Sequence, residues 1–235
     1  YHSLINNLLD YANDIVVTSE QIFDATEALK KFENKISVIP LSFDPIFQNP
    51  HIESKSYRSS DKFKIIYVGK LRKYKGIIYL IEAIRYLDVE LLIVGMGEEK
   101  SNLLNLVNMY QIESKVSFYE GLNDIELAKL YAESNLFVLP SINESEAFGV
   151  VQLEAMANGL PVINTNLNSG VPFVSIDKLT GYTVDPKCSE QITSAILQLM
   201  NNSEIYNEFS RNAISRSKLF SRENLALKYL NLYKK

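Results

Sequence analysis

The sequence predicts an α/β protein built on a doubly wound parallel sheet. From residue 63 onward, short apolar runs of strand length alternate regularly with longer segments whose apolar positions recur at helical spacing. This alternation is the pattern of parallel strands connected by crossover helices. With 235 residues, of which 46% are hydrophobic and 22% charged, the chain is long enough to bury a large core.

The first 43 residues read as helix, strand, helix and strand. Residues 1–12 carry apolar positions at helical spacing and lead into a strand at Ile15–Val17, and a second helix at Gln21–Phe32 leads into a strand at Ile36–Ile39. Such a fragment cannot cover both faces of its strands by itself. We therefore expect residues 1–43 to be the end of a preceding α/β domain, and the chain to be truncated.

The following segment has the composition of a connection, and regular alternation begins after it. Residues 41–61 are rich in serine and proline and show no periodicity. We expect a linker at 44–61, a Rossmann-like domain at 62–218 and a C-terminal helix at 219–235 that packs back toward the N-terminal domain. The predicted strands are 63–68, 89–94, 115–119, 135–139 and 162–163. The predicted helices are 76–87, 98–110, 124–133, one that begins near Gly149, 189–200, 203–219 and 222–233.

Composition excludes several classes of function. A formal net charge of -4 and a pI near 5.4 argue against a nucleic-acid partner, because phosphate contacts need a basic surface. The single Cys188 rules out an internal disulfide framework and a cysteine metal cluster. His2 and His51 have no partners that suggest a metal site, and no Asp-x-Asp pair is present. Because we find no signal peptide and no apolar run of membrane length, we predict a cytoplasmic protein. We also predict that it needs no metal and no cofactor.

Two glutamates mark the segment from Pro140 to Pro161. Glu146 and Glu154 stand eight residues apart, and a helix is predicted to begin close to Gly149 between them. Glu146 therefore precedes the helix and Glu154 lies on it. A helix start beside a carboxylate favours a phosphorylated ligand that is rich in hydroxyl groups.

The loops that follow the strands are predicted to meet at the carboxyl edge of the sheet, where ligands of this architecture bind. The loop from Gly69 to Gly76 holds four cations between two glycines, which suits either a phosphate or a solvated basic turn; its place at the sheet edge favours the phosphate. The pair Gly95-x-Gly97 lacks the third glycine of a dinucleotide fingerprint and indicates a tight turn. Gly121 follows the third predicted strand. A glycine at this position fits either an ordinary strand end or a nucleotide base that packs against the backbone.

Taken together, four motifs resemble the retaining glycosyltransferases of family 4 (group 1), which have the GT-B fold. They are Gly69-Lys-Leu with Lys75-Gly76, Gly95-x-Gly97, Phe118-x-x-Gly121, and the run from Glu146 through Glu154 to Pro161. Ile15–Ser19 and Val38–Pro40 look like the end of that family's acceptor domain, and Gly170-Val-Pro172 with Thr180-Gly181 resembles its late loops. The Ser-Glu-Ala-Phe-Gly variant is similar to enzymes of bacterial surface polysaccharide assembly.

This resemblance implies catalytic roles for Glu146, Lys75 and Lys70, and donor-binding roles for seven further residues, toward a nucleotide diphosphate sugar. Glu154 would bind the ribose hydroxyls, and Glu146 would hold hydroxyls of the donor sugar. The phosphates would face the cations Lys70 and Lys75 and the backbone amides of Phe148, Gly149 and Val150. The donor-binding set also includes Gly69, Arg72 and Gly121. The family usually has Arg where this chain has Lys70, and nearby Arg72 would partly compensate for the lost bidentate contact.

The resemblance implies that the full-length protein transfers a sugar from a UDP- or GDP-sugar, with retention, to a growing bacterial glycan such as lipopolysaccharide or capsule. The partners are then the nucleotide sugar and a glycan or lipid-linked glycan acceptor, and peripheral association with the inner face of the cytoplasmic membrane stays open. This fragment alone is expected to be inactive. A second hypothesis is a nucleotide-sugar binding module without transfer activity; a sugar-nucleotide epimerase is disfavoured by the spacing of the glutamates. The donor base, the sugar, the acceptor and the oligomeric state are not predicted.

Overall fold

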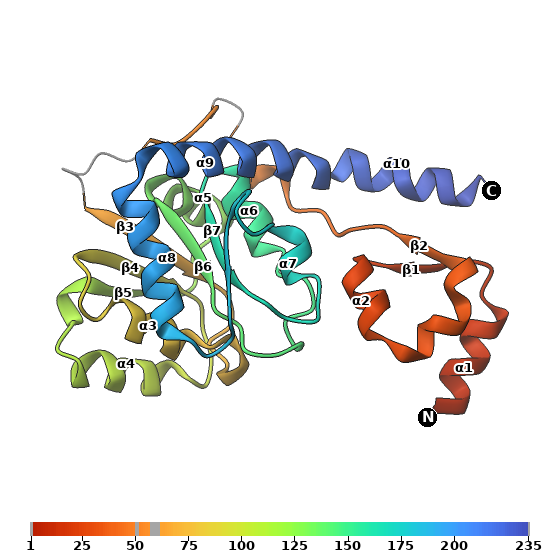
Figure 1. Ribbon diagram of the computed structural model, residues 1–235, viewed down its shortest axis with the longest axis horizontal. Coiled ribbons are helices and arrows are strands. Elements are labelled where there is room, and N and C mark those ends of the chain that lie inside the picture. Colours follow the sequence, from red (N-terminus) through yellow and green to blue (C-terminus); the bar gives the residue numbers. More distant parts are fainter. Residues whose placement is uncertain (1, 50–51, 57–61, 235) are drawn as a thin grey trace.

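The computed structural model describes residues 2–49, 52–56 and 62–234 (Figure 1). A large α/β unit surrounds a six-stranded sheet, and a smaller N-terminal part contains a two-stranded sheet. The connection after Phe43 and the C-terminal helix α10 both run between the two parts (Figure 1). Part of the predicted linker, including His51, lies outside the described residues.

The large sheet is entirely parallel and has the strand order β5-β4-β3-β6-β7-β8. The chain enters at the centre with β3, winds outward to β5, and returns through β6 toward β8. This confirms the predicted doubly wound sheet. The strands are β3 Phe63–Val68, β4 Val89–Val94, β5 Val116–Tyr119, β6 Leu136–Leu139, β7 Val162–Thr165 and β8 Gly181–Val184.

Helices cover both faces of this sheet. Contacts group α3 with α4 and α8, and α6 with α9, and the consecutive helices α8 and α9 join the two groups (Figure 1). The central strands are buried on both faces, as the continuous apolar sequences of β3, β4 and β6 require. The helices are α3 Ile77–Ile84, α4 Lys100–Met109, α5 Asp124–Glu133, α6 Val151–Ala157, α7 Val171–Val174, α8 Ser189–Asn201, α9 Ser203–Ser217 and α10 Arg222–Tyr233.

Two elements of the large unit were not predicted. The stretch beginning at Gly170 forms the short helix α7, and Gly181 begins the edge strand β8, where late loops were expected. The sequence of β8 is short and partly polar, and two of its four residues are half-buried. This strand is defined by its pairing with β7, which begins with Gly181 opposite Val162, and not by a hydrophobic pattern.

The N-terminal part follows the predicted order, but its second helix is broken. The elements are α1 His2–Tyr11, β1 Ile15–Val17, α2 Glu20–Ala25, the 3₁₀ segment η1 Glu27–Lys35 and β2 Ile36–Val38, and the two strands are parallel. The single helix predicted over Gln21–Phe32 is therefore wrong. Thr26 adopts an extended conformation and its hydroxyl donates to the Ile22 carbonyl at 2.7 Å. A β-branched residue that bonds back to the preceding turn favours ending a helix there.

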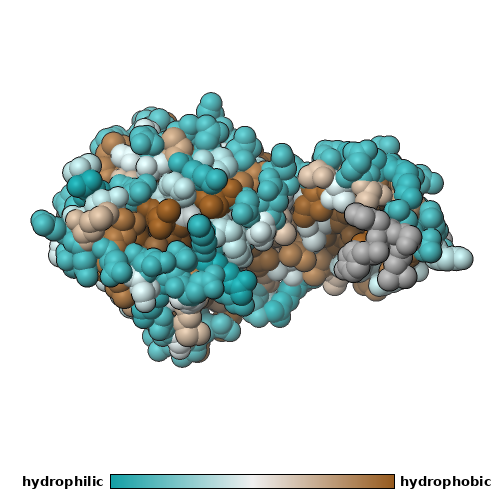
Figure 2. All heavy atoms as spheres, turned by 90° about the horizontal axis from the view of Figure 1, so that it is seen from below, coloured by the Kyte–Doolittle hydropathy of each residue, from teal (hydrophilic) through white to brown (hydrophobic). Residues whose placement is uncertain are grey.

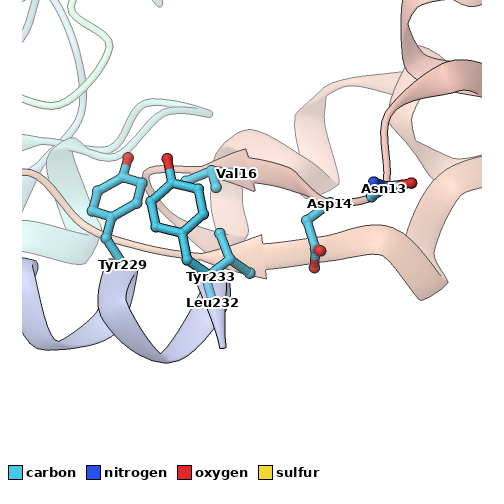
Figure 3. A pocket seen from close by; sticks show the side chains of 6 residues that line it. All are labelled: Asn13, Asp14, Val16, Tyr229, Leu232 and Tyr233. Carbon is cyan, nitrogen blue, oxygen red and sulfur yellow. The ribbon is translucent and has the colours of Figure 1, made fainter. Parts of the chain in front are cut away.

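The last helix reaches the N-terminal part. Side chains from the end of α10 and from the residues around β1 line a pocket of 670 Å³ between them (Figure 3). They are Tyr229, Leu232 and Tyr233 on α10, and Asn13, Asp14 and Val16 opposite. Figure 2 shows apolar surface both on the large unit and where the two parts adjoin, within a mostly hydrophilic exterior. No helix among the described residues is long and apolar enough to cross a membrane.

Candidate functional site at the carboxyl edge of the sheet

The loops that follow the central strands meet at one edge of the sheet, as predicted. Their backbones are hydrogen-bonded to one another in sequence across the sheet. The bonds run from Gly69 N to Val94 O (2.9 Å), Leu71 N to Met96 O (2.8 Å), Gly95 N to Tyr119 O (2.9 Å) and Ile142 N to Tyr74 O (2.8 Å). The edge is therefore a connected backbone surface rather than a set of independent loops.

Glycine is required where these loops approach each other most closely. Gly76 has φ +65°, and a Cβ there would clash with the Pro140 carbonyl oxygen and lie 2.7 Å from Cγ2 of Ile142. Gly95 has φ +145°, and its Cβ would clash with the carbonyl oxygen of Gly69. Both positions combine a backbone conformation that favours glycine with a contact that admits no side chain.

A pocket of 420 Å³ opens at this edge between the loops after β3, β4 and β5. Three predicted site residues, Gly69, Lys70 and Gly121, contribute to its wall. The other lining residues are glycine or apolar: Val68, Val94, Gly95, Met96, Gly97, Leu122 and Leu127. Among the described residues that line it, Lys70 alone carries a charge. Bare backbone, an apolar wall and one ammonium group suit a planar ring attached to an anion.

Lys70 is exposed, and its backbone is held from below. The buried Tyr67 hydroxyl donates to the Lys70 carbonyl at 3.1 Å. Burial raises the pKa of Tyr67 well above its usual value, with smaller contributions from Glu146 and Tyr74, so the phenol remains a donor. Arg72 is also exposed, but it does not line the pocket.

Lys75 and Glu146 form a buried ion pair beside the pocket. Their residues are 8% and 7% exposed, and the Lys75 ammonium donates to Oε2 of Glu146. Ser141 Oγ donates to the same oxygen at 2.9 Å. A Cβ on Gly69 would lie 3.7 Å from Lys75 Nζ, which places the ammonium directly behind the first glycine of the loop. The tertiary structure thus brings Glu146 to two predicted residues of the Gly69–Gly76 loop.

Glu154 occupies a different environment on α6. The Tyr131 hydroxyl of α5 donates to its Oε2 at 2.9 Å. Burial raises the pKa of Glu154, the Tyr131 hydrogen bond lowers it, and the nearby carboxylates Asp124 and Asp44 raise it further. Its hydrogen-bond partner is a phenol rather than an ammonium. The structure therefore does not bring Glu154 into the Lys75–Glu146 pair.

The segment before α6 is fixed by buried amide side chains. Gln152 Nε2 donates to the Phe148 carbonyl at 3.3 Å, and Asn164 Nδ2 donates to Gln152 Oε1 at 2.9 Å. The Phe148 ring points into the core and packs on Phe220 with centroids 6.3 Å apart. Within the described chain, the backbone N–H groups of residues 148–150 donate to no protein acceptor, as is usual at a helix start.

Three contributors to this site were missed from the sequence: Ser141, Tyr67 and Tyr131. Ser141 follows strand β6, so its position at the carboxyl end of a central strand was an available signal. The two tyrosines looked like ordinary core residues of a strand and a helix. Only their hydroxyl partners distinguish them.

The sequence profile of the family "Glycosyl transferases group 1" matches residues 49–216, which include every residue of this edge. The chain belongs to this family. Its sheet and flanking helices have the GT-B architecture of the group 1 glycosyltransferases.

Relatives named as glycosyltransferases match most of the chain. The O-antigen chain mannosyltransferase C of Escherichia coli is 28% identical over 99% of this chain and 63% of its own length. An uncharacterized glycosyltransferase of Haemophilus influenzae is 33% identical over 88% of this chain and 58% of its own length. The chain therefore spans about 60% of the length of these relatives.

Solved structures share the fold. Sucrose-phosphate synthase from Thermosynechococcus elongatus superposes with a TM-score of 0.83 at 27% identity, covering 99% of this chain and 60% of that one. HepE from Anabaena, solved in complex with UDP, also gives 0.83 at 20% identity, covering 99% of this chain and 67% of that one. The second likeness shows the fold alone.

Proposed function

We propose that this chain is the donor-binding half of a retaining family 4 glycosyltransferase that uses a nucleotide diphosphate sugar. The observation that carries the proposal is the buried Lys75–Glu146 pair directly behind Gly69, next to a pocket whose wall carries Lys70. The exposed Lys70 ammonium and the bare backbone of the lining suit a diphosphate attached to a nucleoside. The HepE structure with UDP supports this choice of ligand on the same fold.

We assign the phosphates to the lysine loop. Lys70 is exposed at the pocket, while Lys75 is buried and neutralised by Glu146. As the bond between sugar and phosphate breaks, negative charge grows on the leaving diphosphate, and preorganised cations stabilise it most at that moment. Removing one such donor typically raises a barrier by about 3 kcal/mol. The free N–H groups of residues 148–150 supply further donors in this assignment.

We assign the donor sugar to Glu146. Oε2 already accepts from Lys75 and Ser141, whereas Oε1 accepts no hydrogen bond from the described residues. The second oxygen can therefore accept from a sugar hydroxyl while the first stays fixed. Retention of configuration and the absence of a catalytic metal belong to the same proposal.

We assign the nucleoside ribose to Glu154, and the acceptor to a glycan or lipid-linked glycan of the bacterial surface. The acceptor class follows from relatives named for O-antigen chain mannosyl transfer and for capsular polysaccharide biosynthesis. In this proposal the donor is a UDP- or GDP-sugar made in the cytoplasm, and transfer takes place there or at the inner face of the membrane.

Calorimetry with UDP, GDP, ADP and inorganic pyrophosphate tests these assignments. Glu154→Ala is expected to weaken nucleoside diphosphate binding about tenfold, the value of one lost charge-assisted hydrogen bond, and to leave pyrophosphate affinity unchanged. Lys75→Ala is expected to weaken diphosphate binding more than binding of the bare nucleoside.

Lys62→Ala is the matched control, because Lys62 pairs with Glu90 at 3.7 Å on the surface away from the pocket. It should change no affinity. Equal losses for nucleoside diphosphate and pyrophosphate in Glu154→Ala would refute the ribose assignment. Unchanged diphosphate affinity in Lys75→Ala would refute the phosphate assignment.

A further inference from the structure

Tyr131 is held rigidly beneath Glu154. The residue is fully buried, and its ring packs edge-on against Phe47 with centroids 6.0 Å apart and tilted against Phe137 at 6.3 Å. Its backbone carbonyl accepts from Lys55 Nζ at 3.0 Å. Both the ring and the end of α5 that carries it are therefore fixed, and the hydroxyl can serve as a stationary donor.

Lys55 extends this support into the connection between the two parts. Its ammonium also donates to the carbonyls of Ala132 (2.6 Å) and Ser134, so one side chain satisfies the last carbonyls of α5. Its own backbone N–H donates to Ser210 Oγ on α9 at 2.7 Å. The segment around Lys55 thus ties α5 to α9 behind Glu154.

The phenol determines how the Glu154 carboxylate can be used. Tyr131 occupies Oε2, while Oε1 accepts no hydrogen bond from the described residues. The hydrogen bond from Tyr131 holds Oε2 in place, and Oε1 is left available to an external donor. A vicinal diol is a suitable donor for such a carboxylate.

We propose that Tyr131 is a positioning residue that orients Glu154 to accept the ribose hydroxyls of the nucleotide. This inference rests on the proposed assignment of Glu154 to the ribose. Tyr131 touches no ligand itself; it acts through the carboxylate that it holds.

The same hydrogen bond lowers the pKa of Glu154. Around Glu154, burial and the carboxylates Asp124 of α5 and Asp44 before η2 (Pro45–Phe47) raise its pKa, and the Tyr131 hydroxyl opposes them. Asp44 is itself paired with Arg222. Loss of the hydroxyl therefore moves the pKa of Glu154 further upward. Protonation then removes the acceptor at a higher pH than in the native protein.

The test is Tyr131→Phe, which keeps the buried ring and removes only the hydroxyl. Calorimetry is carried out between pH 5 and pH 8 with whichever of UDP, GDP and ADP binds the native protein most tightly, and with inorganic pyrophosphate. We expect about a tenfold loss of nucleoside diphosphate affinity at pH 7, unchanged pyrophosphate affinity, and an upward shift in the pH at which nucleoside diphosphate affinity falls to half. Glu154→Gln lacks the titrating carboxyl and gives the pH dependence of the remaining groups, which are the ligand phosphates and Lys55, whose pKa burial lowers to about 8.

Tyr206→Phe is the control for losing a buried tyrosine hydroxyl, since Tyr206 is fully buried and donates to the Asn135 carbonyl at 2.8 Å. It should leave the pH midpoint unchanged. If Glu154→Gln weakens binding but Tyr131→Phe moves neither affinity nor midpoint, the positioning role is overturned and the ribose assignment stands. Equal losses for both ligands without a midpoint shift also overturn it. If Glu154→Gln leaves nucleoside diphosphate affinity unchanged, the ribose assignment itself fails.

Discussion

Glu146 and Glu154 lie in one short segment, yet the fold gives them opposite electrostatic environments. Glu146 is neutralised by the Lys75 ammonium and also accepts from Ser141. Among the described residues, a neutral phenol alone hydrogen-bonds to the Glu154 carboxylate, and burial and neighbouring carboxylates raise its pKa. In the proposed assignment both carboxylates accept from uncharged hydroxyls, and Glu146 is the one that lies beside the lysine loop assigned to the diphosphate. Its pairing with Lys75 would offset the repulsion that a bare carboxylate would exert on the phosphates there.

The largest expected effect comes from breaking the ion pair. Glu146→Gln leaves the Lys75 ammonium buried without a counter-charge, so we expect the free energy of unfolding in urea to fall by about 3 kcal/mol. Glu154→Gln removes only the acceptor of a phenol hydrogen bond and should cost about 1 kcal/mol.

The double variant Lys75→Met/Glu146→Gln sharpens this comparison. Because it removes both charges together, it should be more stable than Glu146→Gln alone. Similar costs for Glu146→Gln and Glu154→Gln would show that the two environments do not differ in the way described.

A second prediction concerns the backbone beneath the Glu146 pair. Gly76→Ala forces a Cβ into the Pro140 carbonyl at φ +65°, and we expect it to lower the free energy of unfolding by at least about 2 kcal/mol. Gly121 has nearly the same φ, +67°, but a Cβ there meets nothing within 4 Å. Gly121→Ala should therefore cost only about 1 kcal/mol, the conformational part alone. Equal losses in the free energy of unfolding for the two variants would contradict a close contact at Gly76.

The smallest expected effect comes from a substitution that weakens the support behind Glu154 and leaves the Lys75–Glu146 pair intact. Lys55→Ala frees three carbonyls at the end of α5, and we expect a loss of about 1–2 kcal/mol in the free energy of unfolding. Lys62→Ala removes an exposed pair and should stay within about 0.5 kcal/mol of the native protein. Lys55→Ala should also weaken nucleoside diphosphate binding while pyrophosphate affinity is kept. A loss of pyrophosphate affinity would show that the two sides of the site are not separate.

Prediction of the fold from sequence succeeded where burial is complete. The bounds of β3, β4 and α5 match those expected, because continuous apolar runs and helical periodicity are local signals. It failed at β8, whose half-exposed residues carry no clear alternation, and at Thr26, which divides the expected helix in two. These outcomes depend on a neighbouring strand and on one side-chain hydrogen bond.

For the candidate site, the sequence identified the segments but not their pairings. Gly69, Lys70 and Gly121 line the pocket, and Lys75 with Glu146 lies directly beside it. Arg72 was expected to support the phosphates, but it lies outside the lining. Glu154 was predicted to lie on the helix after Glu146, but its hydrogen-bond partner Tyr131 was not predicted.

The sequence by itself determined the parallel α/β sheet, the edge at which the loops meet and the residue types available there. These follow from periodicity, strand length and the right-handed crossover rule, all of which are local or chiral constraints. Only the tertiary structure decided that one glutamate is paired with a lysine 71 residues away and the other with a tyrosine 23 residues away. Such pairings depend on which side chains packing buries together, and burial makes an unpaired charge too costly to leave.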